Sequence, residues 1–364
     1  MRIGLVKETK PAERRVALTE AGVATLVGDG HEVFVEIGAG SGAGIDDNIY
    51  EQAGAKLVGT ADAWAAELVV KVKEPIASEY GYLRQDSTLF TYLHLAADRA
   101  LTEALLDNRV TAVAYETVED ALGVLPLLTP MSEIAGRLAA HAAGQYLTHP
   151  YGGPGILVGG SPGVAPARVV ILGGGVVGTQ AATLMVGMRA EVTILDVSPR
   201  RVRELEELFR SSARVLQSDP ATVLDQLATA DVVIGAVLVP GAAAPKLVSR
   251  DDLARLKPDT LLIDVAIDQG GCFETSRPTT YDDPVYRVDE ITHYCVANMP
   301  GAVPRTSTRA LTNATLPYLR KVAGLGVDAA LEADAGLARG LNTRAGSITH
   351  DAVAAAFAGS HRAG

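Results

Sequence analysis

A glycine-rich turn between apolar segments carries the clearest chemistry in this chain. Residues 173–178 spell Gly-Gly-Gly-Val-Val-Gly, which matches G-x-G-x-x-G, and they directly follow the apolar segment 168–172. In this pattern Gly173 makes the tight turn, Gly175 lets backbone N–H groups reach a pyrophosphate at a helix N-terminus, and Gly178 lets the helix pack against the strand. The turn therefore predicts a dinucleotide-binding site.

An acid at the end of the next apolar segment indicates which dinucleotide is bound. Residues 191–196 end in Asp196, where a carboxylate hydrogen-bonds the ribose hydroxyls of NAD and repels the 2′-phosphate of NADP. Arg200 and Arg201 follow closely and are the side chains that a 2′-phosphate would favour. We predict NAD as the cofactor.

Other glycine patterns carry less weight. Residues 38–43 fit G-x-G-x-x-A, but no long apolar-periodic helix and no strand ending in an acid follow them, so we interpret them as a mobile loop. Residues 159–163 spell the G-x-S-x-G of a nucleophile elbow. Pro162 has no N–H to donate to an oxyanion, however, and a strand rather than a helix follows.

Cationic side chains near the ends of expected strands suit the binding of an anionic substrate. Arg15 follows the first strand, and a guanidinium there can hold a carboxylate through paired hydrogen bonds; the alternative is a solvated loop cation. Lys73 follows the strand expected at 68–72, where alternation places Lys71 and Lys73 on one face. The alternative is a lysine that only extends along the surface.

Proton-transfer groups follow other strands. His94 stands among apolar residues, and an imidazole with a pKa near 6.5 suits proton transfer, although a hydrogen-bonded core histidine is the common alternative. Asp268 precedes Gly270 and Gly271, so it is a candidate for the same chemistry or merely a cap of that turn.

Composition favours a two-domain enzyme. The chain has 364 residues, of which 48% are hydrophobic, and a formal net charge of −11, which together suit a large core and argue against nucleic acid as a partner. The N-terminus gains an acid before any signal-like apolar segment, and no stretch of about 18 apolar residues is present to span a membrane. We expect a cytoplasmic protein.

The number of cysteines and the spacing of possible metal ligands argue against disulfide bonds and a structural metal site. Cys272 and Cys295 are the only cysteines and are expected to be small buried hydrophobic residues. No cluster of His, Cys and acidic residues has ligand spacing, so no metal is expected.

Strands and helices alternate in the first part of the chain, which predicts an α/β domain with a mostly parallel sheet. The expected strands are 2–6, 32–37, 68–72, 88–91 and 111–114, and the expected helices are 19–28, 46–53, 62–66 and 98–107.

A second α/β domain follows a long amphipathic helix at 132–147 and a Gly- and Pro-rich loop at 148–166. Its expected strands are 168–172, 191–196, 214–216, 232–236 and 260–265. The pattern after Pro304 is helical throughout, at 306–322, 327–333, 335–341 and 350–357, and these helices are expected to return to the first sheet. The prediction is two Rossmann-like domains with an active-site cleft between them: a discontinuous substrate domain, 1–129 plus 305–364, and an NAD-binding domain, 130–304.

Several segments resemble the L-alanine dehydrogenase family, which also contains the NAD-binding subunit of transhydrogenase. They occur in order over nearly the whole chain, at 7–10, 72–75, 92–96, 130–137, 264–271 and 294–300. The resemblance implies that Arg15 and Lys73 bind the substrate carboxylate and carbonyl, and that His94 and Asp268 transfer protons. Besides the glycines of the turn and Asp196, the implied cofactor contacts are Ser132, Val176, Val177, Val237, Leu238, Val239, Ile267, Asp268, Asn298 and Met299.

The activity implied by this resemblance is the reversible NAD-dependent oxidative deamination of L-alanine to pyruvate and ammonium, in a homohexamer. The alternatives are a related amino-acid or imino-acid dehydrogenase, a transhydrogenase-like NAD-binding subunit, and a nonenzymatic NAD-sensing module, which would not require Arg15, Lys73 and His94 together. Glycine, serine and glyoxylate remain open as additional substrates.

Overall fold

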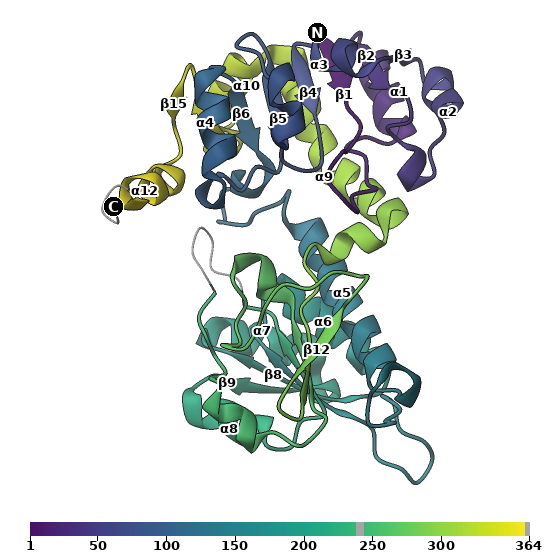
Figure 1. The fold of residues 1–364 in the computed structure, drawn as a ribbon, viewed down its shortest axis with the longest axis vertical. Coiled ribbons are helices and arrows are strands. Elements are labelled where there is room, and N and C mark those ends of the chain that lie inside the picture. Colours follow the sequence, from purple (N-terminus) through teal and green to yellow (C-terminus); the bar gives the residue numbers. More distant parts are fainter. Residues whose placement is uncertain (238–243, 361–364) are drawn as a thin grey trace. The chain divides into compact units, whose positions relative to one another are not determined.

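The chain divides into two compact units. The computed structural model describes residues 1–237 and 244–360. One unit comprises Met1–Met131 with Gly301–Gly364, and the other comprises Ser132–Pro300 (Figure 1). The first boundary falls in the opening turn of helix α5 (Thr129–Tyr146).

The first unit is built on an eight-stranded sheet in the order β15-β14-β6-β5-β4-β1-β2-β3. Strands β1 to β6 are parallel, whereas β14 and β15 pair antiparallel at one edge. The central strands are apolar and buried because helices cover a parallel sheet on both faces. The strands are β1 (Arg2–Leu5), β2 (Glu32–Glu36), β3 (Lys56–Val58), β4 (Leu68–Val70), β5 (Thr88–Thr91), β6 (Thr111–Ala114), β14 (Leu341–Arg344) and β15 (Ser347–Ile348).

The helices of this unit come from both ends of the chain. From the N-terminal part come α1 (Glu20–Gly28), α2 (Asp47–Gln52), α3 (Thr60–Trp64) and α4 (Arg99–Asp107), and from the C-terminal part α9 (Pro304–Leu325), α10 (Val327–Ala333), α11 (Ala335–Arg339) and α12 (Asp351–Ser360). Helix α9 holds the segment before α1, because the hydroxyls of Thr308 and Thr312 each accept a backbone N–H, from Val16 and Thr19, at 3.1 Å. The late helices thus return to the first sheet. Helix α12 extends away from the sheet beyond β15 (Figure 1).

The expectation that only helices follow Pro304 is wrong. Helix α11 ends at Arg339, and β14 and β15 then form a hairpin at the edge of the sheet. Ala345 and Gly346 turn the chain with φ values of 51° and 82°, the left-handed pair that a tight two-residue hairpin requires. Gly346 was the sequence signal for this turn.

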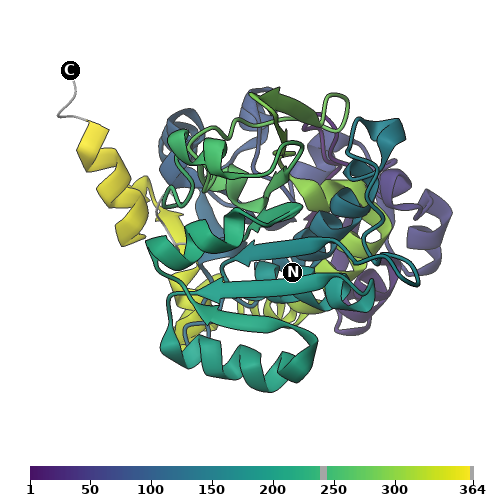
Figure 2. The same ribbon diagram turned by 90° about the horizontal axis from the view of Figure 1, so that it is seen from below.

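The second unit contains a seven-stranded sheet in the order β12-β13-β11-β10-β7-β8-β9, and its strands lie side by side in Figure 2. All pairs are parallel except β12 with β13, a hairpin that the sequence analysis did not predict. The strands are β7 (Arg168–Leu172), β8 (Glu191–Asp196), β9 (Arg214–Gln217), β10 (Val232–Gly235), β11 (Leu261–Asp264), β12 (Val285–Val288) and β13 (Ile291–Tyr294), and the helices after α5 are α6 (Val176–Gly187), α7 (Pro199–Phe209) and α8 (Pro220–Leu227).

The parallel strands of each sheet follow the order 3-2-1-4-5-6 of a Rossmann fold, which confirms the predicted fold class. In the second sheet the antiparallel strand β12 lies at the edge beyond β13. The order reverses between β1 and β4 in the first unit and between β7 and β10 in the second. Ligands of open α/β sheets bind outside the carboxyl ends of the strands at such points.

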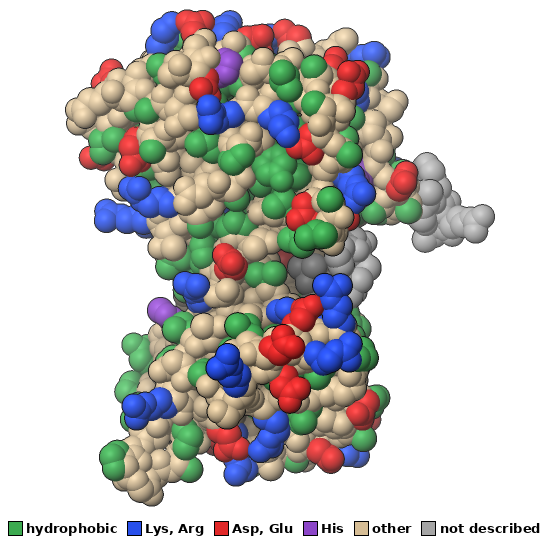
Figure 3. Space-filling model, turned by 180° about the vertical axis from the view of Figure 1, so that it is seen from behind, with side chains coloured by type: hydrophobic (Ala, Val, Ile, Leu, Met, Phe, Trp, Pro, Cys, Tyr) green, Lys and Arg blue, Asp and Glu red, His purple; other side chains and the backbone are tan. Residues whose placement is uncertain are grey.

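The distribution of charge on the surface and the polarity of the helices are relevant to the partners that the sequence predicts. Acidic and basic side chains are interspersed over the face drawn in Figure 3. Within the described ranges, every helix is too short or too polar to serve as a membrane span.

Candidate active site

The predicted substrate residues of the first unit follow strands that lie side by side. Arg15 follows β1, Lys73 follows β4 and His94 follows β5, and β1, β4 and β5 are neighbours in the sheet. Because the strands are parallel, their carboxyl ends meet at one edge. Tyr92 joins these residues, since its ring stacks on that of His94 at 6.0 Å and its hydroxyl is close enough to Arg15 to feel its charge.

Arg15 is a buried cation held by an acid. Its side chain is only 2% exposed, and it donates from Nε to Glu13 Oε1 at 2.7 Å and from Nη2 to Oε2 at 2.5 Å. Burial alone would lower the pKa of the guanidinium, but the hydrogen bonds and charge of Glu13 outweigh it and raise that pKa. The alternative of a solvated loop cation is therefore wrong, and sequence reasoning missed Glu13.

Lys71 belongs to a second buried ionic group. Its ammonium is 1% exposed and lies 2.8 Å from Glu79 Oε1 and 3.4 Å from Glu8 Oε2. Glu8 also accepts the backbone N–H of Val72 at 2.6 Å and that of Lys73 at 3.4 Å. Strand β4 ends at Val70, and just beyond it Glu8 accepts the N–H of Val72 in place of a strand partner. The expectation that Lys71 and Lys73 share a strand face is wrong.

Lys73 presents its cation differently. Its side chain is half-buried, and among the described residues its ammonium forms no hydrogen bond or ion pair. The neighbouring Glu74 is paired with Lys10. Burial raises the pKa of Glu74, but the charges of Lys73 and Lys10 outweigh burial and lower it. Lys73 is thus available to an anionic ligand.

His94 is exposed and backbone-constrained. Its side chain is 46% exposed and its φ is 53°, in the left-handed region. Glu116, which follows β6, accepts the N–H of His94 at 2.6 Å and the N–H of Leu93 at 3.1 Å, and its Oε1 lies 3.9 Å from His94 Nδ1. The core-histidine alternative is wrong. Glu116 was missed, although it follows the strand next to β5.

The glycine turn of the second unit has the geometry that a pyrophosphate requires. Gly175 is the N-cap of α6. Among the residues that the structure describes, no side chain caps that helix, and a Cβ added at Gly175 would meet no atom within 4 Å. A Cβ at Gly178 would lie 1.9 Å from the Gly173 carbonyl oxygen, so helix and turn pack as closely as glycine allows. Gly173 has a φ of 98°. These residues therefore fit a dinucleotide.

Asp196 ties the turn to the end of β8. Its Oδ2 accepts the N–H of Gly174 and its Oδ1 the N–H of Ser198, both at 2.8 Å. Arg201 donates to the Gly174 carbonyl at 2.7 Å and to Glu204 at 2.9 Å, and Arg200 also pairs with Glu204. Both arginines that a 2′-phosphate would favour are engaged with protein acceptors.

The remaining predicted proton-transfer and cofactor-binding residues differ in how far they are exposed. Asp268 is exposed in the 3-10 helix Val265–Gln269, and its Oδ1 accepts the N–H of Asn298 at 3.4 Å. Ile267 and Met299 are buried, at 4% and 3% exposure, so their side chains belong to the packing of the second unit. Of the others, Ser132, Val176, Val177 and Val237 are at least partly exposed, and Leu238 and Val239 lie outside the described residues.

The glycine pattern at residues 38–43 and the two cysteines, which the sequence analysis did not assign to the site, belong to the packed structure. The interpretation of residues 38–43 as a mobile loop is wrong. A Cβ at Gly40 would lie 2.6 Å from the Ile45 carbonyl oxygen and one at Gly42 2.6 Å from that of Arg14, so these residues form a closely packed turn. Cys272 and Cys295 are both fully buried, and burial raises the pKa of each thiol, which confirms that they are small core residues.

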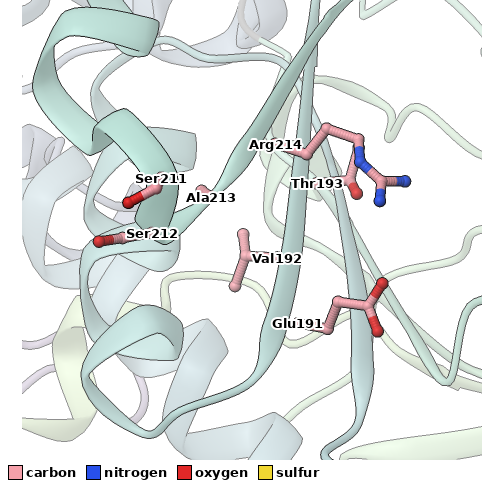
Figure 4. Close-up of a pocket in the computed structure, with 7 residues that line it drawn as sticks. All are labelled: Glu191, Val192, Thr193, Ser211, Ser212, Ala213 and Arg214. Atoms are coloured by element: carbon pink, nitrogen blue, oxygen red, sulfur yellow. The ribbon is translucent and has the colours of Figure 1, made fainter.

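A shallow hollow of about 260 Å³ lies at the other end of the second sheet (Figure 4). Val192 and Thr193 of β8 line it, together with Ser211 and Ser212 from the turn before β9. It is at the amino ends of these strands, away from the glycine turn, and contains none of the predicted site residues.

Comparison with known proteins gives matches over nearly the whole chain and confirms the resemblance. The family descriptions "Alanine dehydrogenase/PNT, N-terminal domain" and "Alanine dehydrogenase/PNT, C-terminal domain" match residues 4–135 and 139–351. Alanine dehydrogenase of Mycobacterium tuberculosis is 54% identical, over 97% of this chain and 96% of the relative, and that of Bacillus subtilis is 51% identical, over 97% and 94%.

Solved structures agree. An L-alanine dehydrogenase superposes with a TM-score of 0.95 at 51% identity, covering 99% of both chains. A transhydrogenase from Sinorhizobium meliloti superposes with a TM-score of 0.81 at 25% identity, covering 97% of this chain and 100% of the other.

Proposed function

This chain belongs to the alanine dehydrogenase/PNT family, and we propose that it catalyses the reversible NAD-dependent oxidative deamination of L-alanine to pyruvate and ammonium. The observation that carries the proposal is the grouping of Arg15, Lys73 and His94 after adjacent strands of one sheet, in a chain whose other sheet carries a dinucleotide turn. A module that only senses NAD has no need for two cations and an exposed histidine.

Arg15 and Lys73 bind the substrate in this proposal. The carboxylate of alanine or pyruvate pairs with the guanidinium of Arg15, which Glu13 keeps charged and fixed. The ammonium of Lys73 stabilises negative charge on the oxygen that becomes the carbonyl of pyruvate. Fixing both ends of a three-carbon substrate orients its α-carbon for reaction.

The second unit holds NAD in this proposal. The open N-terminus of α6 fits the pyrophosphate and Asp196 fits the ribose hydroxyls. Bound NAD supplies the hydride acceptor for the α-hydrogen of alanine.

His94 and Asp268 move the protons of the deamination. Water adds to the iminium formed from alanine, and the resulting carbinolamine loses ammonia to give pyruvate, so protons leave water and reach nitrogen. The exposed imidazole of His94 exchanges these protons, and Asp268 is the second proton-transfer group of the proposal. The proposal thus takes one proton-transfer group from each unit.

The setting of the enzyme forms part of the proposal. We assign the substrate domain to 1–129 with 305–364 and the NAD domain to 130–304. The partners are small molecules, namely L-alanine, pyruvate and ammonium, and the enzyme is a cytoplasmic homohexamer.

The decisive test measures NADH formation with each small L-amino acid and NADH consumption with pyruvate and ammonium. L-Alanine is expected to support turnover; absence of alanine-dependent NADH would refute the proposal. The likeness to a transhydrogenase makes hydride transfer between two nucleotides the second candidate, so transfer from NADH to an NADP analogue without amino acid is measured in parallel.

The role of His94 is tested in the same assay. His94→Ala is expected to lower kcat by about 10² to 10⁴ in both directions while NADH still binds. If the variant kept more than about a tenth of wild-type turnover, another group would carry the proton.

A further inference from the structure

The loop that carries Asp268 is closed by one buried carboxylate. Asp264, the last residue of β11, is 0% exposed. Its carboxylate accepts the N–H groups of Ala266 at 3.1 Å, Cys272 at 2.9 Å and Phe273 at 3.3 Å, and the hydroxyl of Ser276 at 2.5 Å. It thus binds the chain both before and after Asp268.

Lys246 satisfies the carbonyl groups of the same loop. Its ammonium donates to the carbonyl oxygens of Gly270 at 2.6 Å, Gly271 at 2.8 Å and Phe273 at 3.3 Å. Backbone N–H groups beside it take two more, from Ala244 to Gln269 at 3.0 Å and from Leu247 to Cys272 at 2.7 Å. Each backbone carbonyl from residue 269 to residue 273 therefore has a partner.

This double anchorage matters because the loop turns on adjacent glycines. Gly270 and Gly271 have φ values of 88° and 75°, and glycine has the largest backbone freedom to lose. A Cβ at Gly271 would lie 2.6 Å from Asp264 Oδ2, so the turn packs directly on the carboxylate. Within the described part of the chain, the side chain of Asp268 has one long hydrogen bond, to Asn298, and its position therefore depends on the loop.

We propose that Asp264 and Lys246 are positioning residues that hold the Asp268 carboxylate in place for proton transfer. Asp264 accepts the backbone N–H groups of the loop, and Lys246 donates to its backbone carbonyl oxygens. The inference rests on the role proposed for Asp268. Neither residue touches the reacting atoms. Displacing a reacting group by about 1 Å costs as much as 10²-fold in rate, so loss of either anchor acts on turnover through Asp268.

Lys246→Met is the first test, because this exposed residue can change without opening the core. We expect kcat for alanine to fall roughly 10- to 100-fold, the NADH dissociation constant to change little, and amide hydrogen exchange over residues 265–273 to accelerate. Lys257→Met is the matched control: Lys257 pairs with Asp231 at 2.5 Å in the same unit, just ahead of β11. It is expected to leave turnover and the exchange of this loop unchanged.

A double variant separates this inference from the proposed function. If Lys246 acts through Asp268, Lys246→Met lowers kcat little further in an Asp268→Asn background, and both single variants shift the pH dependence of kcat in the same direction. Asp264→Asn, which keeps the shape and loses the charge, reproduces the effect and the faster exchange.

Several results would overturn the inference. These are wild-type kcat in Lys246→Met, equal losses in Lys246→Met and Lys257→Met, a lower kcat without faster exchange in the loop, or full additivity with Asp268→Asn. Wild-type turnover in Asp268→Asn would instead remove the proposed role of Asp268, and with it the premise.

Discussion

The buried pair between Glu13 and Arg15 allows a quantitative prediction, tested by Glu13→Gln. The amide keeps the shape of the carboxylate and removes its charge. Arg15, which is 2% exposed, then loses its hydrogen-bonded counter-charge and keeps weaker interactions such as the charge of Glu8. Its donors on Nε and Nη2 lose the charged acceptors that they now have at 2.7 and 2.5 Å.

The magnitude follows from burial. Removing one partner of a buried ion pair costs about 3 to 5 kcal/mol, since the remaining charge stays desolvated. That is a large part of the roughly 5 to 15 kcal/mol by which a folded protein is stable. Glu13→Gln is therefore expected to destabilise the first unit severely, and Arg15→Met added to it is expected to recover part of the loss.

The chain contains a matched control. Arg84 and Asp86 form the same paired contact two residues apart, at 3.0 and 2.5 Å, but their side chains are 42% and 68% exposed. An exposed pair contributes about 0 to 1 kcal/mol, because water and salt screen it. Asp86→Asn should thus change the free energy of unfolding only slightly.

Denaturant unfolding of the wild type, Glu13→Gln and Asp86→Asn measures the change in the free energy of unfolding. Titration of the folded Glu13→Gln variant with pyruvate measures how well Arg15 still binds the substrate carboxylate. We expect weaker pyruvate binding, because Glu13 fixes the guanidinium. If Glu13→Gln lowered the free energy of unfolding by less than about 1 kcal/mol, as expected for an exposed pair, the argument that burial sets the strength of this contact would be refuted.

Further predictions concern the cofactor, the substrate and pH. Asp196→Ala should narrow the preference for NAD over NADP, measured as the ratio of kcat/KM values; an equal ratio in wild type and variant would contradict the role of the carboxylate. Lys73→Ala should weaken pyruvate binding far more than NADH binding in titrations, and normal pyruvate affinity would place the site elsewhere. Hydrogen bonds from Lys321 and from the N–H of Leu337 lower the pKa of Asp334. Its contribution to stability is therefore complete at neutral pH and lost as pH falls from about 4. Asp334→Asn should make the free energy of unfolding depend less on pH over that range. If the wild type and the variant lost stability in parallel as pH fell, the pair of Asp334 and Lys321 would contribute nothing.

Local patterns were enough to predict strands β7 to β11 of the second unit and its glycine turn, but not the hairpin of β12 and β13. The strands at 168–172 and 191–196 were predicted to the residue, because apolar β-branched segments, a glycine turn and an acid all agree on one structure. The C-terminal hairpin was missed since β14 and β15 are short and their stability comes from pairing with β6, which lies far away in sequence.

The partners of the site residues were harder to predict because topology, and not spacing, selects them. Glu116 reaches His94 only because β6 lies beside β5. Lys246 reaches Gly270 through a segment that runs beside the loop. Glu13 could have been inferred, since it stands two residues before Arg15, but its contact depends on the burial of both side chains.

The positions of these acids follow one physical rule. A parallel strand that ends inside a protein leaves backbone N–H groups without a ladder partner, and a carboxylate is an acceptor that satisfies two of them at once. Each region of the proposed site contains such a carboxylate accepting at least two backbone N–H groups: Glu8 for Val72 and Lys73, Glu116 for Leu93 and His94, Asp196 for Gly174 and Ser198, and Asp264 for Cys272 and Phe273. These hydrogen bonds fix Lys73, His94, the glycine turn and the loop of Asp268. Because each carboxylate oxygen has two acceptor sites, Asp196 can also accept the ribose hydroxyls of NAD. Substitution of one of these acids should therefore change turnover through the neighbour that it positions.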